Sequence, residues 1–338
     1  MKGRLVLLGQ YEGREAAALM ENGRLEDLLV DSDAPRPGTI YRARPGRPMK
    51  GQGGLFVTTP DGAAYLRQLR GIPPGKPLLV QVTGYAEPGK AIPVTTRLMF
   101  KSRYAIVTPG APGMNVSRSI RDEARADSLR LLAREVAGDA AEGLILRSAC
   151  AEAEDDAIAA DIAAMVEIAG TVCADLAGEP ETLLEGDGPH ALAWRDWAEP
   201  SDLDEGPDVL DAHGVLDAIE ALRNPEVSLS GGASLCVEPT RALVAVDVNT
   251  GTDSSPAAGL KANLAAIREL PRQLRLRGLG GQITVDLAPM SRKDRQQLET
   301  ALRAAFRRDP VETAFLGWTP SGHLELQRQR ARPPLEVT

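Results

Sequence analysis

The chain has 338 residues, of which 43% are hydrophobic, and a formal net charge of −8, so it can bury a core and should divide into two or three domains. Its three scattered cysteines exclude a disulfide framework and a cysteine zinc site, and its three histidines lack metal-ligand spacing. No segment approaches the roughly 18 apolar residues of a membrane span or resembles a signal peptide, so we expect a cytoplasmic protein without a membrane partner.

The first predicted elements are three short strands at 5–8, 16–20 and 28–30. Asn22-Gly23, between the second and third strand, is a strong signal for a tight hairpin. A stretch rich in Pro, Gly and Arg then predicts a domain boundary. Short strand-like segments joined by Gly/Pro turns follow and predict a small β-barrel. These segments are 40–43, 55–58, 78–83 and 92–95.

The middle of the chain predicts a helix over 119–136, a strand over 143–148 and a helix over 153–176. The acidic segment 178–207 is interrupted by Gly and Pro, which indicates connecting structure. The last third alternates between strands and helices, and this order predicts a crossover that joins parallel strands. Its expected elements are strands near 228 and 235, strand 243–248, helix 258–277, strand 283–287, helix 292–308, and strands near 313 and 324.

Charge is unevenly distributed along the chain. Residues 36–150 carry 18 basic and 8 acidic side chains, residues 151–220 carry 1 and 20, and residues 261–310 carry 11 and 5. Each block could simply be a solvated helix face. Two basic blocks nevertheless make a polyanion-binding surface a serious alternative.

Two aspartates end neighbouring strand-like runs in the last third. Asp247 ends the run that begins at Ala242, and Asp286 ends the run that begins at Gln282. If the two strands are adjacent, both carboxylates emerge at one edge of the sheet, where ligands bind in open α/β sheets. Oxygen-only ligation suits Mg²⁺, and Asn249 could hold a metal-bound water or a phosphate oxygen. Alternatively, each Asp could merely cap a helix or turn a loop.

The residues around both aspartates resemble a known family. Residues 230–249, SGGASLCVEPTRALVAVDVN, closely resemble the ribonuclease E/G segment that carries its first metal-binding aspartate. Residues 272–286, RQLRLRGLGGQITVD, are similar to the segment that carries the second. The resemblance implies that Asp247 and Asp286 hold the catalytic Mg²⁺ and that Asn249 assists them.

Further sites are implied by the same resemblance. Arg147 and Ser148 match the family's 5′-phosphate sensor, with Ser in place of the usual Thr, and an Arg fork with a hydroxyl suits a terminal phosphate. The region 37–96 resembles a shortened S1-type OB-fold that clamps single-stranded RNA. Stacking aromatics, basic contacts and two terminal arginines complete the expected RNA-binding set. Its members are Phe56, Tyr65, Lys90, Arg328 and Arg330. Core packing for the aromatics and surface salt bridges for the arginines are the alternatives.

The resemblance implies an α+β, multi-subdomain fold. Residues 1–35 and 186–224 should form an RNase H-like subdomain, 36–98 the shortened S1/OB-fold barrel, 99–185 the 5′-sensor region, and 225–338 a DNase I-like α/β catalytic subdomain. No cysteine pair follows Arg330, whereas the family shares a zinc between subunits through such a pair. Any homo-oligomer should therefore form without a shared zinc.

The implied function is a magnesium-dependent endoribonuclease that hydrolyses single-stranded RNA in rRNA or mRNA processing or decay, leaving 5′-phosphate and 3′-hydroxyl ends. The main alternative is a catalytically weak RNA-binding protein of the same fold, which the shortened barrel and the missing zinc link would favour. A ribosome assembly factor acting through the acidic segment 151–220 is a third hypothesis. Cleavage of RNA with and without Mg²⁺ distinguishes them.

Overall fold

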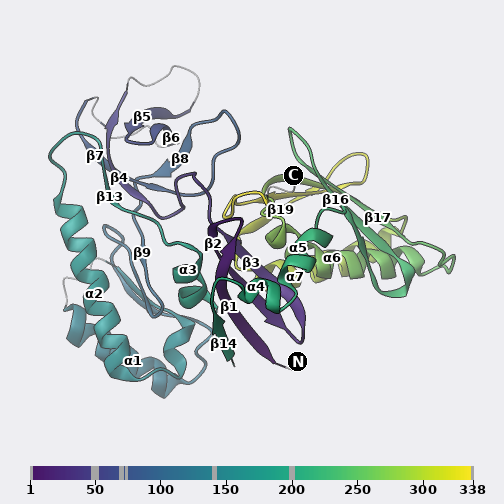
Figure 1. Ribbon diagram of the computed structural model, residues 1–338, viewed down its shortest axis with the longest axis horizontal. Helices are drawn as coiled ribbons and strands as arrows, with labels where there is room; N and C mark the ends of the chain where they lie inside the picture. Colours follow the sequence, from purple (N-terminus) through teal and green to yellow (C-terminus); the bar gives the residue numbers. More distant parts are fainter. Residues whose placement is uncertain are drawn as a thin grey trace. The chain divides into compact units, whose positions relative to one another are not determined.

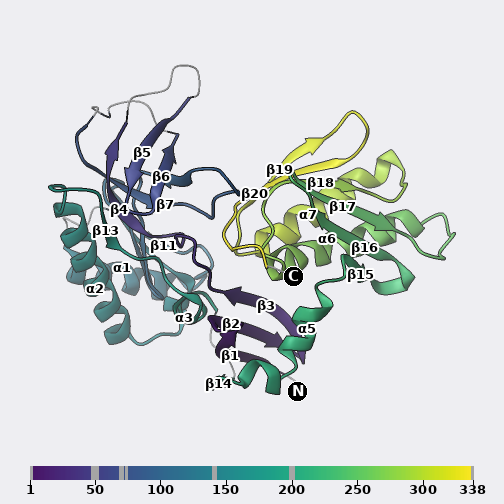
Figure 2. The same ribbon diagram turned by 45° about the horizontal axis from the view of Figure 1, so that its top comes forward.

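A computed structural model of the chain describes residues 3–46, 53–67, 72, 75–138, 143–197 and 202–335. It consists of two compact units (Figures 1 and 2). Unit 1 comprises residues 1–32 and 200–338, and unit 2 comprises residues 33–199. Unit 1 therefore contains both ends of the chain, and unit 2 is inserted between its two segments.

The first part of unit 1 is a four-stranded sheet in the order β14-β1-β2-β3. Its strands are β1 (Arg4–Tyr11), β2 (Arg14–Glu21), β3 (Arg24–Val30) and β14 (Asp202–Glu205). Asn22 and Gly23 both have positive φ, 51° and 82°, as a two-residue hairpin turn of the expected kind requires. Two short helices, α4 (Val209–Ala212) and α5 (Val215–Ala221), pack on this sheet through a shared apolar cluster.

The second part of unit 1 is a six-stranded sheet in the order β15-β16-β17-β18-β20-β19. Its elements are β15 (Glu226–Ser228), η2 (Ser230–Gly232), β16 (Ser234–Pro239), β17 (Val244–Asn249), α6 (Ala258–Leu276), β18 (Gly281–Asp286), η3 (Arg292–Asp294), α7 (Arg295–Arg308), β19 (Thr313–Trp318) and β20 (Leu324–Arg328). We call it the catalytic sheet. As predicted, α6 connects two parallel neighbours, β17 and β18.

The two faces of the catalytic sheet differ. Alternate residues of β17 and β18, such as Val246 and Val285, are buried in one apolar cluster with side chains of α6 and α7, which cover that face (Figure 2). The residues between them are half-buried or exposed, and Asp247 and Asp286 are exposed. Because strand side chains alternate between faces, these polar residues lie on the face that the two helices leave open.

Unit 2 contains the predicted small barrel. Strand β4 pairs with both β5 and β7, which closes a five-stranded barrel in the order β4-β5-β6-β8-β7. The strands are β4 (Ile40–Pro45), β5 (Leu55–Thr59), β6 (Gly62–Leu66), β7 (Leu78–Val82) and β8 (Ile92–Thr95), and β13 (Glu181–Leu184) joins β4 from outside the ring. The barrel and the mixed α/β class are confirmed, whereas the finer subdomain labels stay predictions.

The rest of unit 2 is a small mixed sheet covered by helices. Its elements are β9 (Phe100–Lys101), β10 (Ala105–Val107), β11 (Met114–Val116), α1 (Glu123–Ala137), β12 (Leu144–Leu146), η1 (Ser148–Ala151), α2 (Asp155–Ala174) and α3 (Pro189–Asp196). Helix α2 is the single helix in the described ranges whose length and apolar composition match a membrane span. On these two criteria alone that is weak evidence, and its Ile158 and Ile162 are fully buried in the core of unit 2.

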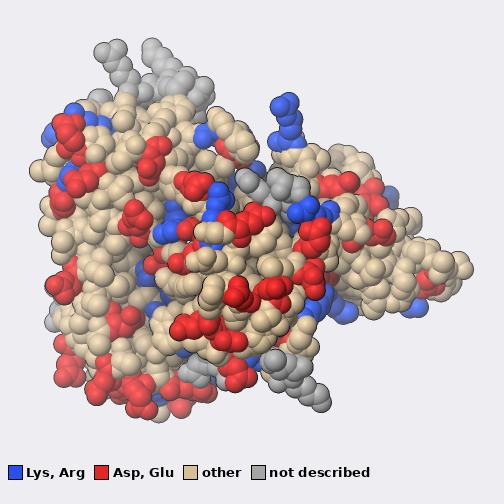
Figure 3. All heavy atoms as spheres, viewed as in Figure 1, with Lys and Arg blue, Asp and Glu red and all other residues tan. Residues whose placement is uncertain are grey.

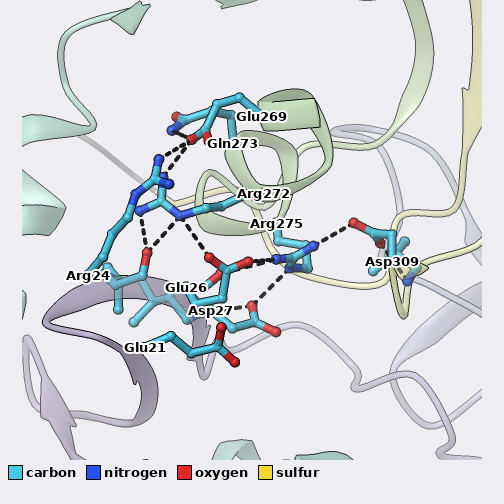
Figure 4. A network of polar contacts seen from close by, with 12 residues as sticks. Glu21, Arg24, Glu26, Asp27, Glu269, Arg272, Gln273, Arg275 and Asp309 are labelled. Atoms are coloured by element: carbon cyan, nitrogen blue, oxygen red, sulfur yellow. Dashed lines mark hydrogen bonds and ion pairs between the residues drawn. The ribbon is translucent and has the colours of Figure 1, made fainter. Parts of the chain in front are cut away.

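A buried polar network holds unit 1 together. Figure 4 shows Arg272 and Arg275 of α6 reaching acidic side chains of β3 and the loop after α7. Arg275 pairs with Glu26 at 2.8 Å and with Asp309 at 2.7 Å. Arg328 is also buried, pairing with Asp309 at 3.1 Å. Arg272 and Arg275 of the second basic block therefore stabilise the fold and are not free for a polyanion.

Candidate active site on the catalytic sheet

Asp247 and Asp286 lie side by side on the catalytic sheet. They are direct partners in the parallel register of β17 and β18, and neighbouring strands are about 4.8 Å apart. Both side chains are exposed on the open face. No Lys or Arg of the described ranges forms a salt bridge with either one. Two adjacent carboxylates without a Lys or Arg partner repel each other, and a bound cation would relieve that repulsion.

The third expected residue also belongs to this group. The Asn249 Nδ2 donates a hydrogen bond to the Asp247 Oδ2 at 2.7 Å. The bond orients the Asp247 carboxylate. No cluster of three or more His, Cys, Asp or Glu side chains in the described ranges is arranged to hold a metal ion. Two carboxylates leave the other ligand positions of a hard cation to water and substrate oxygens, an arrangement that Mg²⁺ usually adopts.

One residue of the site was missed by the sequence interpretation. The His323 Nε2 lies 3.6 Å from the Asp286 Oδ1, just before β20. The spacing of the three histidines along the chain excluded them from consideration. The signal was available in the strand pattern: polar and apolar residues alternate in His323-Leu324-Glu325-Leu326, which predicts that His323 lies on the face opposite the buried leucines.

The two terminal arginines have different environments. Arg328 is 2% exposed, and its guanidinium bonds to the Thr313 Oγ1 at 2.8 Å in addition to Asp309. Burial lowers the pKa of Arg328 to about 10, against the opposing effect of Asp309. We therefore assign Arg328 to the fold and not to a phosphate contact. Arg330 is half-buried, with its guanidinium against the backbone of Gly281.

The aromatic pair lies on the outside of the barrel. Phe56 and Tyr65 face each other across β5 and β6, with ring centroids 5.4 Å apart. Their strand neighbours point into the barrel core, whereas Phe56 is 37% exposed. Lys90 is exposed between β7 and β8 and pairs with Glu87 at 2.5 Å. Base stacking requires aromatic rings on an outer surface, and these two rings occupy such a position.

The expected phosphate sensor is occupied by the chain's own groups. The Arg147 Nη1 donates to the Ser102 carbonyl at 2.6 Å, and its Nη2 donates to the Asp196 Oδ1 at 2.7 Å. Burial would raise the pKa of Asp196, but Arg195 and Arg147 hold it below its usual value. Ser148 is exposed beside this group. A phosphate would have to replace the Asp196 carboxylate to reach Arg147.

Helix α3, which the sequence interpretation grouped with the first strands, packs in unit 2 instead. The Arg103 Nη1 donates to the Trp194 carbonyl at 2.7 Å, and its guanidinium lies 4.5 Å from the Trp194 ring centroid. Arg195 pairs with Asp187 at 2.5 Å. Residues near 190 therefore contribute to the environment of Arg147.

The surface charge is mixed on the face that Figure 3 shows. Lysines and arginines are interspersed with acidic residues there, and the described part of this face has no continuous basic surface. Asp and Glu gather where α1 and α2 lie. Within each unit, the described part of this face therefore shows no broad polyanion-binding surface.

Comparisons with known proteins identify the family of this chain. The model of the "Ribonuclease E/G family" matches residues 99–205 and 199–331. Ribonuclease G of Salmonella typhimurium is 26% identical over 94% of this chain and 78% of its own length. Ribonuclease E of a Nostoc species is 26% identical over 94% of this chain and 55% of its own length. A chloroplastic ribonuclease E/G-like protein of Arabidopsis thaliana is 35% identical over 38% of this chain and 14% of its own length. Because the family model matches well over half of the residues, this chain belongs to the ribonuclease E/G family.

Proposed function

We propose that this chain is a magnesium-dependent endoribonuclease that cleaves single-stranded RNA and leaves 5′-phosphate and 3′-hydroxyl ends. Membership of the ribonuclease E/G family supports the enzyme class. The observation that carries the proposal is the in-register position of Asp247 and Asp286 on the open face of the catalytic sheet. When bound there, Mg²⁺ would supply an activated water and offset charge on the scissile phosphate.

The residues of the chain have distinct tasks in this proposal. Asp247 and Asp286 hold the cation, and Asn249 keeps the Asp247 carboxylate oriented through its 2.7 Å hydrogen bond. Phe56 and Tyr65 offer an outward aromatic surface on which bases can stack. Such stacking is tolerant of sequence and requires unpaired bases, which favours single-stranded RNA as the substrate.

The direct test is cleavage of an end-labelled single-stranded RNA oligonucleotide with Mg²⁺ and with EDTA. We expect internal cleavage only with Mg²⁺, and downstream products that a 5′-phosphate-dependent exonuclease degrades. Binding of the RNA without cleavage at any Mg²⁺ concentration would instead support the catalytically weak RNA-binding alternative. A blunt-ended duplex of the same sequence serves as the control substrate and should be cleaved poorly.

The affinity for RNA should fall as salt rises. Each phosphate neutralised by Lys or Arg on a single strand contributes about −0.7 to the slope of log K against log salt concentration. The affinity is measured by fluorescence anisotropy of labelled RNA, with a cleavage-deficient variant, at salt concentrations between about 50 and 200 mM. A flat dependence would show that stacking alone holds the RNA and would contradict phosphate contacts.

We also propose that Arg147 contacts the terminal 5′-phosphate of the substrate. Arg147→Ala should slow cleavage of 5′-monophosphorylated RNA by about tenfold or more and leave 5′-hydroxyl RNA nearly unchanged, because a charge-assisted bond is lost only in the first case. The rates on the two substrates are compared in single-turnover assays. Arg130→Ala, which breaks an exposed salt bridge on α1, is the matched control. An equal loss on both substrates would mean that Arg147 serves the fold of unit 2.

A further inference from the structure

A cavity of about 310 Å³ lies in unit 1 between the first half of α6 and the two loops that flank the end of β17. It is separate from the aspartate pair and was not predicted from the sequence. Its volume is at the lower end of the range for small-molecule sites. The lining residues include Ser230, Thr250, Asp253, Lys261, Ala265 and Arg268.

The backbone defines the walls of this cavity. Gly231 and Gly232 have φ of 77° and 78°, values that favour glycine. A Cβ added at Gly251 would lie 2.0 Å from the Gly232 carbonyl oxygen. The loop before β16 and the loop after β17 therefore touch and hold each other in place. Side chains from these loops line a preformed site and not a gap between loosely packed segments.

The cavity combines positive charge with small and hydroxyl side chains. Lys261 and Arg268 are seven residues apart, so they lie two turns apart on one face of α6, with Ala265 between them. Asp253 lies 3.8 Å from Lys261 and also accepts a hydrogen bond from the Ser255 amide. Among the described residues, Arg268 has no acidic partner within salt-bridge distance. The charge of Lys261 is thus partly balanced by Asp253, whereas Arg268 is available to pair with an anionic ligand.

The cavity lies beyond the end of β17, the strand that carries Asp247 and Asn249, on the side of the sheet that α6 covers. Thr250 directly follows Asn249, and Ser230 is four residues before Ser234, which pairs with Asn249 across β16 and β17. Three residues of extended chain, about 10 Å, separate Thr250 from Asp247. An RNA strand whose scissile phosphate lies at the aspartate pair can therefore reach the cavity with an adjacent nucleotide.

We propose that this cavity is a nucleotide subsite that receives one unstacked nucleotide next to the cleaved bond. Lys261 and Arg268 contact its phosphate, and the space beside Ala265 accepts the base, with the Ser230 and Thr250 hydroxyls as hydrogen-bonding groups. Single-stranded RNA is commonly read through bases turned out in this way. The inference rests on the proposed ribonuclease function and adds a basis for cleavage preference.

The test uses two variants and one control in the full chain. Ala265→Leu fills the space for the base, and Arg268→Glu reverses the charge at the phosphate. Arg308→Glu makes the same charge reversal at an exposed position near the end of α7, outside the cavity. Steady-state cleavage is measured on RNA oligonucleotides that carry each of the four bases at each position flanking the cleaved bond.

We expect Ala265→Leu and Arg268→Glu to raise the KM by about tenfold and to abolish base preference at one flanking position, with a small change in kcat. Arg308→Glu should change neither quantity by more than about twofold. Wild-type KM and base preference in both cavity variants would overturn the inference and leave the proposed function intact.

A binding measurement tests the nucleotide subsite separately from the proposed ribonuclease function. Methyl spectra of alanine-labelled wild-type protein are recorded with adenosine or uridine 5′-monophosphate in EDTA, so no cleavage is needed. Shifts at the Ala258 and Ala262 methyls, reduced in Arg268→Glu, would support the subsite even if no ribonuclease activity were found. An absence of shifts at these methyls at millimolar nucleotide would overturn the subsite.

Discussion

Asp247→Asn is expected to reduce RNA cleavage by about a thousandfold or more while leaving the fold and most RNA affinity intact. Under the proposed function, the substitution removes one of two negative charges that would hold the cation. A metal ion contributes several kcal/mol to such a reaction, with each 1.4 kcal/mol worth tenfold. The side chain is exposed on the open face, so no core packing is lost. The measurement is single-turnover cleavage of labelled RNA, with circular dichroism to check the fold.

Two comparisons make this prediction specific to metal binding. Asp286→Asn should act in the same way, and the residual activity of either variant should need a higher Mg²⁺ concentration for half-maximal rate. Asp217→Asn, an exposed carboxylate on α5 in the same unit, should behave like wild type. Wild-type rates in either site variant, or an unchanged Mg²⁺ dependence with a reduced rate, would contradict the assignment of the pair as metal ligands.

The catalytic sheet could be predicted because its segments carry their own signals. Residues 244–249 alternate between buried apolar and exposed side chains, and α6 and α7 have apolar faces at helical spacing. The strand-helix-strand order then implied adjacent parallel strands, and the register of Asp247 with Asp286 agrees with that inference. Local pattern and chain order were sufficient here because one crossover joins the two strands.

Other strands had no local signal and form through pairing alone. Strand β14 (Asp202–Glu205) consists of four exposed residues, three of them acidic, and lies in parallel register with β1. Strand β6 (Gly62–Leu66) contains Gly and two Ala, which are poor strand formers. It is stabilised by pairing with β5 and β8 within the closed barrel. A partner as distant in sequence as β1 is from β14 cannot be recognised from such a segment.

The basic block near residue 270 shows a similar limit for the site. A charge count treats Arg272 and Arg275 as candidates for RNA contact, but their partners include Glu26 and Asp309, which lie far away in the sequence. Because both arginines are largely buried and paired with acidic side chains, they serve the fold and are not candidates for RNA contact. The count is informative only for cations that the fold leaves exposed, such as Arg268.

The buried network itself leads to the second large prediction. Asp27→Asn should lower the free energy of unfolding of unit 1 by about 3–5 kcal/mol at neutral pH, the usual cost of breaking a buried ion pair from one side. Asp27 is 3% exposed and accepts hydrogen bonds from the Arg332 Nη2 and the Leu28 amide, both at 2.9 Å. Removing its charge leaves the Arg332 and Arg275 guanidinium groups buried near a neutral side chain.

The same residue predicts how stability depends on pH. Burial alone would raise the pKa of Asp27, but Arg332 and Arg275 hold it below the ordinary value. Its stabilising effect is therefore complete above the unfolded pKa of about 4 and is lost as pH falls through that value toward the lower folded pKa.

The test is urea unfolding of wild type and Asp27→Asn at pH 7 and near pH 3. The difference in unfolding free energy between the two proteins should be smaller at the lower pH. Glu220→Gln, which breaks the exposed pair with Arg223 in the same unit, should cost less than about 1 kcal/mol at either pH. A difference between wild type and Asp27→Asn that stays constant from pH 7 to 3 would show that the charge of Asp27 is not what stabilises the network.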